Sequence, residues 1–152
     1  MLPAISLAQT IHKKKDQIVY EGKIETTGDS YNRSQSFLLS DENADSVKDD
    51  KDKKALTAVI KLKLPSTYHL QEYISYKVKL HPTADTIEYE INDVQLASRE
   101  RGEKLKVLSS QELLKGMGES GNTARDAEKV LNEMDMYIQL FIARMQSALV
   151  YQ

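Results

Sequence analysis

The chain has 152 residues, of which 40% are hydrophobic and 29% charged, and its formal net charge is −2. This size and composition are typical of a soluble protein with one core and an appendage. The absence of cysteine excludes disulfides, thiolate metal sites and a cysteine nucleophile, and no run is apolar for long enough to cross a membrane. The balanced charge gives no overall basic signal for nucleic acid, and the acidic excess falls in residues 41–54 and 107–152.

Residues 1–16 are predicted to form a flexible arm that ends in a basic cluster of Lys13, Lys14 and Lys15. The mildly apolar start of the chain precedes this cluster, which reverses the order found in a secretion signal. We therefore expect a cytoplasmic protein that does not insert into a membrane.

Residues 17–106 are predicted to form a β-domain of five strands. Residues 17–25 alternate between apolar and polar side chains, with Gly22 as a candidate bulge, and Tyr31–Leu39 is the second strand candidate. Residues 41–54 are too polar to bury, so a mobile hairpin tip is expected there.

The third strand is the clearest, because the alternation is unbroken over Ala55–Leu64, and a single helical turn is expected at Tyr68–Glu72. The last two strands, 73–80 and 87–94, are predicted to pair as an antiparallel hairpin across a turn at 81–86. The predicted register places apolar residues opposite one another on one face, and on the other face it places Lys79 opposite Glu88 and Lys77 opposite Glu90.

Residues 107–152 are predicted to form a helical extension. The capping box at residues 109–112 starts a short helix, and a long helix is expected over about 124–150. Its apolar residues recur at intervals of three and four, and the centre of that stripe is Leu131, Met134, Ile138, Phe141 and Met145. Such a stripe either packs on the core of its own domain or joins subunits, and we expect a homo-oligomer.

Motifs for catalysis are missing from the sequence. It contains three histidines but no nucleophile elbow, zinc-protease motif or phosphate-binding loop, so we expect a protein that is not an enzyme and has no cofactor. Acidic residues in 41–54 partly copy a calcium loop, but they lack its central glycine and its final glutamate. A solvated loop without metal is the preferred interpretation.

Aromatic and basic residues are interleaved along the predicted strands. The chain has eight tyrosines but no tryptophan, and several of the tyrosines lie near lysine or arginine. Single-strand binding needs aromatic rings that stack on bases and cations that contact phosphates. The predicted contacts are Tyr31, Arg33, Lys61, Lys63 and Tyr73, joined by Lys13, Lys14 and Lys15 of the arm. The alternative is an ordinary sheet surface, because tyrosine is a good strand former.

Five strands with a helical element between the third and fourth follow the order of an OB-fold, a small Greek-key barrel that binds oligonucleotides. The predicted fold is therefore mainly β, with a five-stranded OB-like barrel followed by a short and a long C-terminal helix. A β-sandwich fragment and an open α+β sheet are the alternatives.

Three segments carry a resemblance to a known family: S-Y-N-R-S-Q-S-F-L-L-S-D-E-N-A-D (30–45), A-V-I-K-L-K-L-P (58–65) and Y-K-V-K-L (76–80). Over residues 17–97 the chain resembles OB-fold single-stranded-DNA-binding accessory proteins of Gram-positive conjugative plasmids and transposons. The resemblance implies a DNA-coating role in conjugation or replication, without base specificity. The alternative function is a structural or interaction module that oligomerises through its C-terminal helix or a sheet edge.

Overall fold

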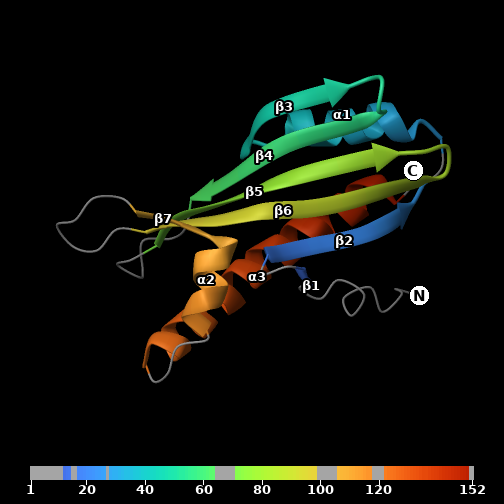
Figure 1. Ribbon diagram of the computed structural model, residues 1–152. Helices are drawn as coiled ribbons and strands as arrows, with labels where there is room; N and C mark the ends of the chain where they lie inside the picture. The colour runs from blue at the N-terminus through green and yellow to red at the C-terminus, as the bar shows by residue number, and fades with distance from the viewer. Residues whose placement is uncertain are drawn as a thin grey trace.

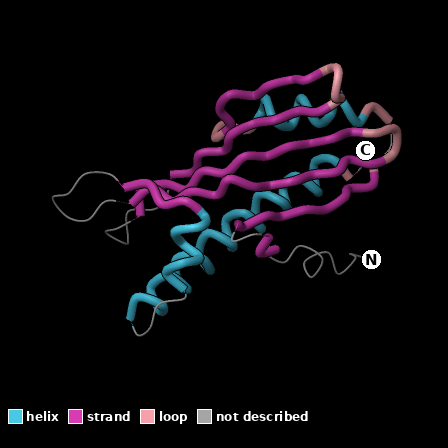
Figure 2. The backbone as a smooth tube through the Cα atoms, in the orientation of Figure 1, coloured by secondary structure: helices cyan, strands magenta, loops and turns pink. Residues whose placement is uncertain are grey.

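A computed structural model describes residues 12–14, 17–26, 28–63, 71–98, 106–117 and 122–150 of the chain. Its strands form one twisted antiparallel sheet, and helices cover one face of that sheet (Figure 1). Figure 2 shows the same two layers, with the long C-terminal helix running along the back of the sheet. No helix in the described part of the chain is long and apolar enough to span a membrane.

The sheet is open. Its strands are β1 (His12–Lys14), β2 (Gln17–Glu25), β3 (Ala44–Asp50), β4 (Ala55–Lys63), β5 (Gln71–Pro82), β6 (Thr86–Ser98) and β7 (Lys106–Ser109). The order across the sheet is β1-β2-β6-β5-β4-β3, and β7 pairs with the end of β6 beyond β2. The prediction of a mainly β fold with a short and a long C-terminal helix is confirmed, but the described strands do not close into an OB-like barrel.

Two helices pack on the same face of the sheet. These are α1 (Ser30–Ser40), between β2 and β3, and α3 (Asn122–Leu149), whose bounds agree closely with the predicted long helix. The short α2 (Ser110–Met117) packs at one end, against α3, β2 and β7. One hydrophobic cluster joins the sheet to the helices, and its α3 members include Leu131, Met134, Ile138, Phe141 and Met145. The ring of Phe141 meets Tyr76 of β5 and Phe37 of α1.

The prediction of a strand over Tyr31–Leu39 is wrong, because these residues form α1. Asp29 caps the helix by accepting a hydrogen bond from the backbone N–H of Asn32 at 3.3 Å. Ser30, Ser34 and Leu38 are buried at helical spacing, which brings a narrow face of mostly small side chains against the sheet.

The prediction of a mobile tip over 41–54 is also wrong. Residues Ala44–Asp50 form the edge strand β3, which pairs with β4 and leaves only the turn at 51–54. A register shift between Asp45 and Lys48, with Ser46 at φ 54°, breaks the regularity of this edge. Charges and a bulge on an edge strand oppose pairing with another chain. Most of the helical turn predicted at 68–72 lies outside the described residues, and Gln71 already belongs to β5.

The predicted faces of the β5–β6 hairpin are correct, but its register is wrong by two residues. Leu80 lies opposite Tyr89 and Val78 opposite Ile91, while Lys79 lies opposite Glu90. The strands continue to Pro82 and Thr86, so the turn is shorter than predicted. The hydroxyl and N–H groups of Thr83 and Thr86 close it through several hydrogen bonds.

Gly22 is a point of close approach, because the pairing of β2 with β6 runs through it without a bulge. A Cβ atom at this position would lie 2.3 Å from the hydroxyl oxygen of Tyr89, on the neighbouring strand. The ring of Tyr89 therefore occupies the space that a side chain at Gly22 would need.

Candidate functional site

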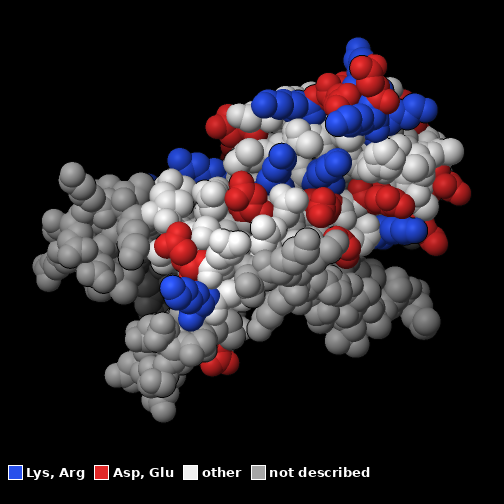
Figure 3. All heavy atoms as spheres, in the orientation of Figure 1, with Lys and Arg blue, Asp and Glu red and all other residues white. Residues whose placement is uncertain are grey.

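The candidate site lies on the face of the sheet that points away from α1 and α3. Figure 1 looks onto this uncovered face, and Figure 3 shows basic and acidic side chains side by side across it. The strand pairings arrange these side chains in rows across the sheet, about 6.6 Å apart along the strands because every second residue points to the same face.

The two rows at one end of this face contain Lys61, Lys63 and Tyr73. Lys63 lies directly opposite Tyr73, and the ammonium nitrogen of Lys61 lies 4.1 Å from the centre of the Tyr73 ring. The lysines are exposed and Tyr73 is half-buried. Their cross-strand neighbours on β6 and β7 are uncharged: Ala97, Val107, Gln95 and Ser109. We call Lys61, Lys63 and Tyr73 the basic aromatic cluster.

Two further lysines continue from this cluster along β5. Lys77 lies opposite Val59 on β4 and opposite Asn92 on β6, so no carboxylate directly faces it. Lys79 lies in the next row, opposite Thr57 and Glu90. Within the part of the chain that the structure describes, Lys61, Lys63, Lys77 and Lys79 form no ion pair.

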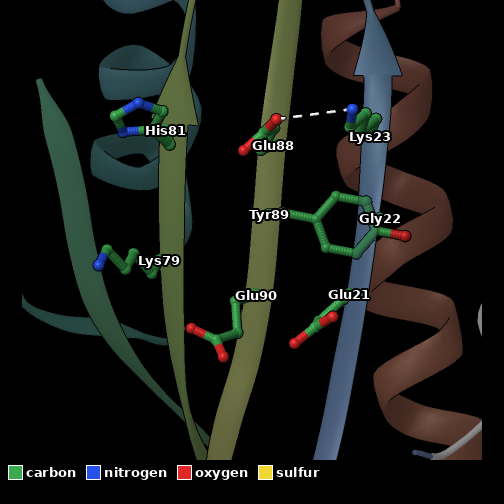
Figure 4. A pocket seen from close by; sticks show the side chains of 8 residues that line it. All are labelled: Glu21, Gly22, Lys23, Lys79, His81, Glu88, Tyr89 and Glu90. Carbon is green, nitrogen blue, oxygen red and sulfur yellow. Dashed lines mark ion pairs between the residues drawn. The ribbon is translucent and has the colours of Figure 1, made fainter.

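Three carboxylates lie on β2 and β6 at the other end of the uncovered face. Glu21 of β2 lies directly opposite Glu90 of β6, and Lys23 lies opposite Glu88, with 3.7 Å between its ammonium nitrogen and a carboxylate oxygen. Figure 4 shows these four side chains around a shallow hollow of about 570 Å³, with His81 at its edge. We call Glu21, Glu88 and Glu90 the acidic band.

Arg33 does not lie near the basic aromatic cluster. It lies on α1, on the covered side of the sheet, and donates a hydrogen bond to the Thr26 hydroxyl at 2.7 Å. Its other terminal nitrogen donates to the last carbonyls of α3, those of Leu149 at 3.2 Å and Ala148 at 3.4 Å. A cation satisfies carbonyls that have no partner within the helix, so Arg33 acts as a C-terminal cap for α3.

Tyr31 also belongs to α1, where its hydroxyl donates a hydrogen bond to the carboxylate of Asp49 on β3. The structure therefore separates Tyr31 and Arg33 from Lys61, Lys63 and Tyr73. Lys13 and Lys14 belong to β1, but their side chains lie outside the described part of the structure, as does the whole of Lys15.

The calcium-like segment gives no cation site among the described residues, where no group of three or more metal-ligating side chains is found. Asp41 accepts a hydrogen bond from the backbone N–H of Asn43 and lies 3.6 Å from Arg144 of α3. Asp49 is engaged by Tyr31. Two members of the segment therefore hold helices to the sheet or shape the loop.

Two buried tyrosines have strongly raised pKa values. Burial raises the pKa of the Tyr20 hydroxyl, which also donates a hydrogen bond to Asp135 of α3 at 2.8 Å. Burial likewise raises the pKa of Tyr76, with a further contribution from the charge of Asp41. Both hydroxyls therefore stay protonated at neutral pH and serve as packing groups.

Sequence reasoning set aside Lys77 and Lys79, which the structure places in line with the basic aromatic cluster. The predicted register pairs both lysines with glutamates, whereas in the structure Lys79 faces Glu90 and Lys77 faces Asn92. The signal that could have found them is the alternation K-x-K in both β4 and β5, which puts two lysines of each strand on one face.

No family model and no curated protein matches the chain. Two solved structures share its fold. A TBP-like protein from Parabacteroides distasonis ATCC 8503 is 16% identical, with a TM-score of 0.70 over 89% of this chain and 94% of that one. A DUF4468 family protein from Bacteroides ovatus ATCC 8483 is 11% identical, with a TM-score of 0.57 over 93% of this chain and 95% of that one. At these identities the likeness establishes the fold and carries no function.

Proposed function

We propose that the chain is a non-enzymatic module that binds single-stranded DNA without sequence specificity, through the basic aromatic cluster. The observation that carries the proposal is the gathering of Lys61, Lys63 and Tyr73 on an uncovered sheet face, in rows that hold no carboxylate. An accessible aromatic ring and neighbouring cations are the two groups that single-strand binding requires, and the half-buried Tyr73 ring lies on the uncovered face.

Binding requires Lys61 to leave the ring of Tyr73. An exposed cation–π contact contributes about 0.5–1 kcal/mol. A base stacked on an aromatic side chain contributes about 1–3 kcal/mol. The exchange is therefore favourable when a base takes the place of the ammonium group on the ring and that group moves to a phosphate.

The absence of sequence preference follows from the same chemistry. Every base has a π-face that can stack on Tyr73, and phosphate contacts from Lys61 and Lys63 carry no sequence information. Nothing in this mechanism requires a catalytic group, a metal or a cofactor. The role in a conjugative element, implied by the sequence resemblance, stays a prediction.

The test is a fluorescence-anisotropy titration of labelled oligo-dT at low salt, with wild-type protein and K61E/K63E. The charge reversal removes two cations from an exposed surface where they form no ion pair with described residues, so folding is expected to be unaffected. Wild type should bind, and K61E/K63E should lose most of the affinity. The control outside the cluster is Lys23→Glu, which alters an exposed lysine of β2 that pairs with Glu88 of the acidic band. Absence of wild-type binding at high protein concentration would overturn the proposal.

A second candidate is self-association through the outer side of α3. The predicted stripe of this helix is buried in the core, but Met136 and Leu140, one turn apart, are 50% and 56% exposed. We propose this ridge as the oligomer contact if the chain is not a monomer. The test is the molar mass of wild type and of M136S/L140S, measured by light scattering; the two substituted side chains are exposed, so the core stays intact. If wild type is an oligomer and M136S/L140S has the same mass, the ridge is not the contact.

A further inference from the structure

The uncovered face carries a groove next to the basic aromatic cluster. This hollow, of about 730 Å³, lies over β4 at the end of the sheet where β3 and β4 are joined by a turn. Its floor includes the small side chains of Ala55 and Thr57. Lys48 of β3 stands on one side, and Lys77 and Lys79 of β5 stand on the other.

Four lysines form a track that leads from the cluster into this groove. Along the strands the order is Lys63, Lys61, Lys77 and Lys79, one in each successive row of the uncovered face. The step between rows is about 6.6 Å, so the track is about 20 Å long. All four lysines are exposed, and none forms an ion pair with another described residue.

The acidic band adjoins the Lys79 end of this track. Glu90 of β6 lies opposite Lys79, Glu88 lies one row further on, opposite His81, and Glu21 of β2 lies opposite Glu90. Glu21 and Glu90 lie directly opposite one another, and their two negative charges repel an anion placed near them. The acidic residues Asp50 and Asp52 stand where the groove meets the β3–β4 turn. Glu90 also lines the groove, and Asp45 of β3 lies opposite Val59 in the row of Lys77. Carboxylates therefore border the lysines, and the lysines themselves mark the lengthwise path for a polyanion.

We infer that a nucleic-acid strand lies lengthwise along β4 and β5, from Tyr73 to Lys79, with its phosphates on the lysine track. This inference rests on the proposed function and assigns it a path. The basic aromatic cluster holds one end of the strand, and the groove holds the following nucleotides. Glu90 and Glu88 oppose binding on β6 at the Lys79 end, while β6 carries no lysine beside the other rows, so the lysines of β4 and β5 set the path.

The test is the salt dependence of binding, measured with an oligo-dT of about 12 nucleotides, a length within the range that small single-strand-binding domains cover. Four neutralised phosphates give a slope of log K against log salt of about −2.8, since each contributes about −0.7. K77Q/K79Q should halve that slope. The same relation gives a factor of roughly eight per contact at about 50 mM salt, so this variant should bind about 60-fold more weakly.

Two variants provide controls that general damage to the protein cannot imitate, one in the acidic band and one at the neighbouring Lys23. E88Q/E90Q should bind more tightly than wild type, because the substitutions remove repulsion beside the track. K23Q should not weaken binding, although Lys23 is an exposed strand lysine like the other four. A loss of affinity in K23Q equal to that in K77Q/K79Q would overturn the inference.

The outcomes separate the path from the function. In one outcome wild type binds with a salt slope near −1.4, K77Q/K79Q has the same slope and K61Q/K63Q does not bind. The proposed function then stands and the path is wrong. If wild type binds no oligo-dT, both fail. If polyglutamate displaces the oligonucleotide at equal charge concentration, the track is a general polyanion site and its assignment to nucleic acid is wrong.

Discussion

Replacement of Arg33 by alanine should destabilise the protein and leave its affinity for oligo-dT unchanged. The guanidinium donates to the Thr26 hydroxyl at 2.7 Å and to the carbonyls of Leu149 and Ala148 at 3.2 and 3.4 Å. The last turn of α3 has no basic residue of its own, so Arg33 supplies the cation that the C-terminal end of this helix favours.

The expected loss follows from these contacts. A hydrogen bond from a charged donor contributes about 1.5–3 kcal/mol to stability. Arg33 is half-buried and the two carbonyl bonds are long, so the three contacts together are expected to contribute about 2 kcal/mol. For a domain of this size that loss lowers the melting temperature by about 4–8 °C.

The assay is thermal and urea denaturation followed by circular dichroism, with anisotropy on the same samples. Arg33→Lys is the matched variant, because it keeps a cation near the end of α3 but cannot reach three oxygens with one planar fork. It should lose part of the stability that Arg33→Ala loses. K61Q/K63Q should give the opposite pattern, with unchanged melting and weaker binding. If Arg33→Ala melts like wild type but binds DNA poorly, Arg33 belongs to the binding surface and the structural role is wrong.

Three further predictions concern the core. Gly22→Ala should cost about 1–3 kcal/mol because its Cβ would overlap Tyr89, and Tyr89→Val should recover part of that loss in the double mutant. Phe141→Ala, at the contact between α1, α3 and the sheet, should lower the free energy of unfolding by about 3–5 kcal/mol. Urea denaturation measures this loss, and a changed m value would show that the substitution acts on the unfolded state instead. Stability should fall as pH rises above 10, because Tyr20 and Tyr76 keep their protons in the folded state while the unfolded chain loses them. Ultraviolet titration should show that these two tyrosines ionise only when the protein unfolds.

The sequence was sufficient to predict β2, β4 and the two C-terminal helices, because each has a periodic pattern over many residues. In β4 the residues Leu56, Ala58 and Ile60 point to the core, as the alternation predicts. In α3 the stripe predicts both the helix and its buried side. The basic aromatic cluster was predicted in part, since Lys61, Lys63 and Tyr73 lie together and Arg33 does not.

The incorrect secondary-structure predictions at α1 and β3 have a common cause. In both segments tertiary contacts, and not local sequence, determine the secondary structure. The apolar residues of α1 are concentrated at Phe37–Leu39, which gives no helical period, and the helix depends on the Asp29 cap and on small buried serines. Strand β3 is strongly charged and is held by its pairing to β4, with only Ala44 and Val47 packed against the core. Local propensity is a weak guide where pairing supplies most of the stabilisation.

The register error at the β5–β6 hairpin explains why the site was only partly predicted. A shift of two residues keeps every side chain on its own face, so the apolar pattern cannot distinguish the two registers. The charge pairs between lysine and glutamate favoured the incorrect one, but such exposed pairs contribute only about 0.2–1 kcal/mol. The hydrogen-bonded turn at Thr83–Thr86 adds pairing between Pro82 and Ile87. The turn and this pairing together outweigh the lysine–glutamate pairs of the predicted register. The resulting register places Asn92 opposite Lys77 in place of a glutamate, while Lys79 still faces Glu90. This one change leaves Lys77 without a directly opposite carboxylate, and it joins Lys77 to the row sequence of Lys63 and Lys61.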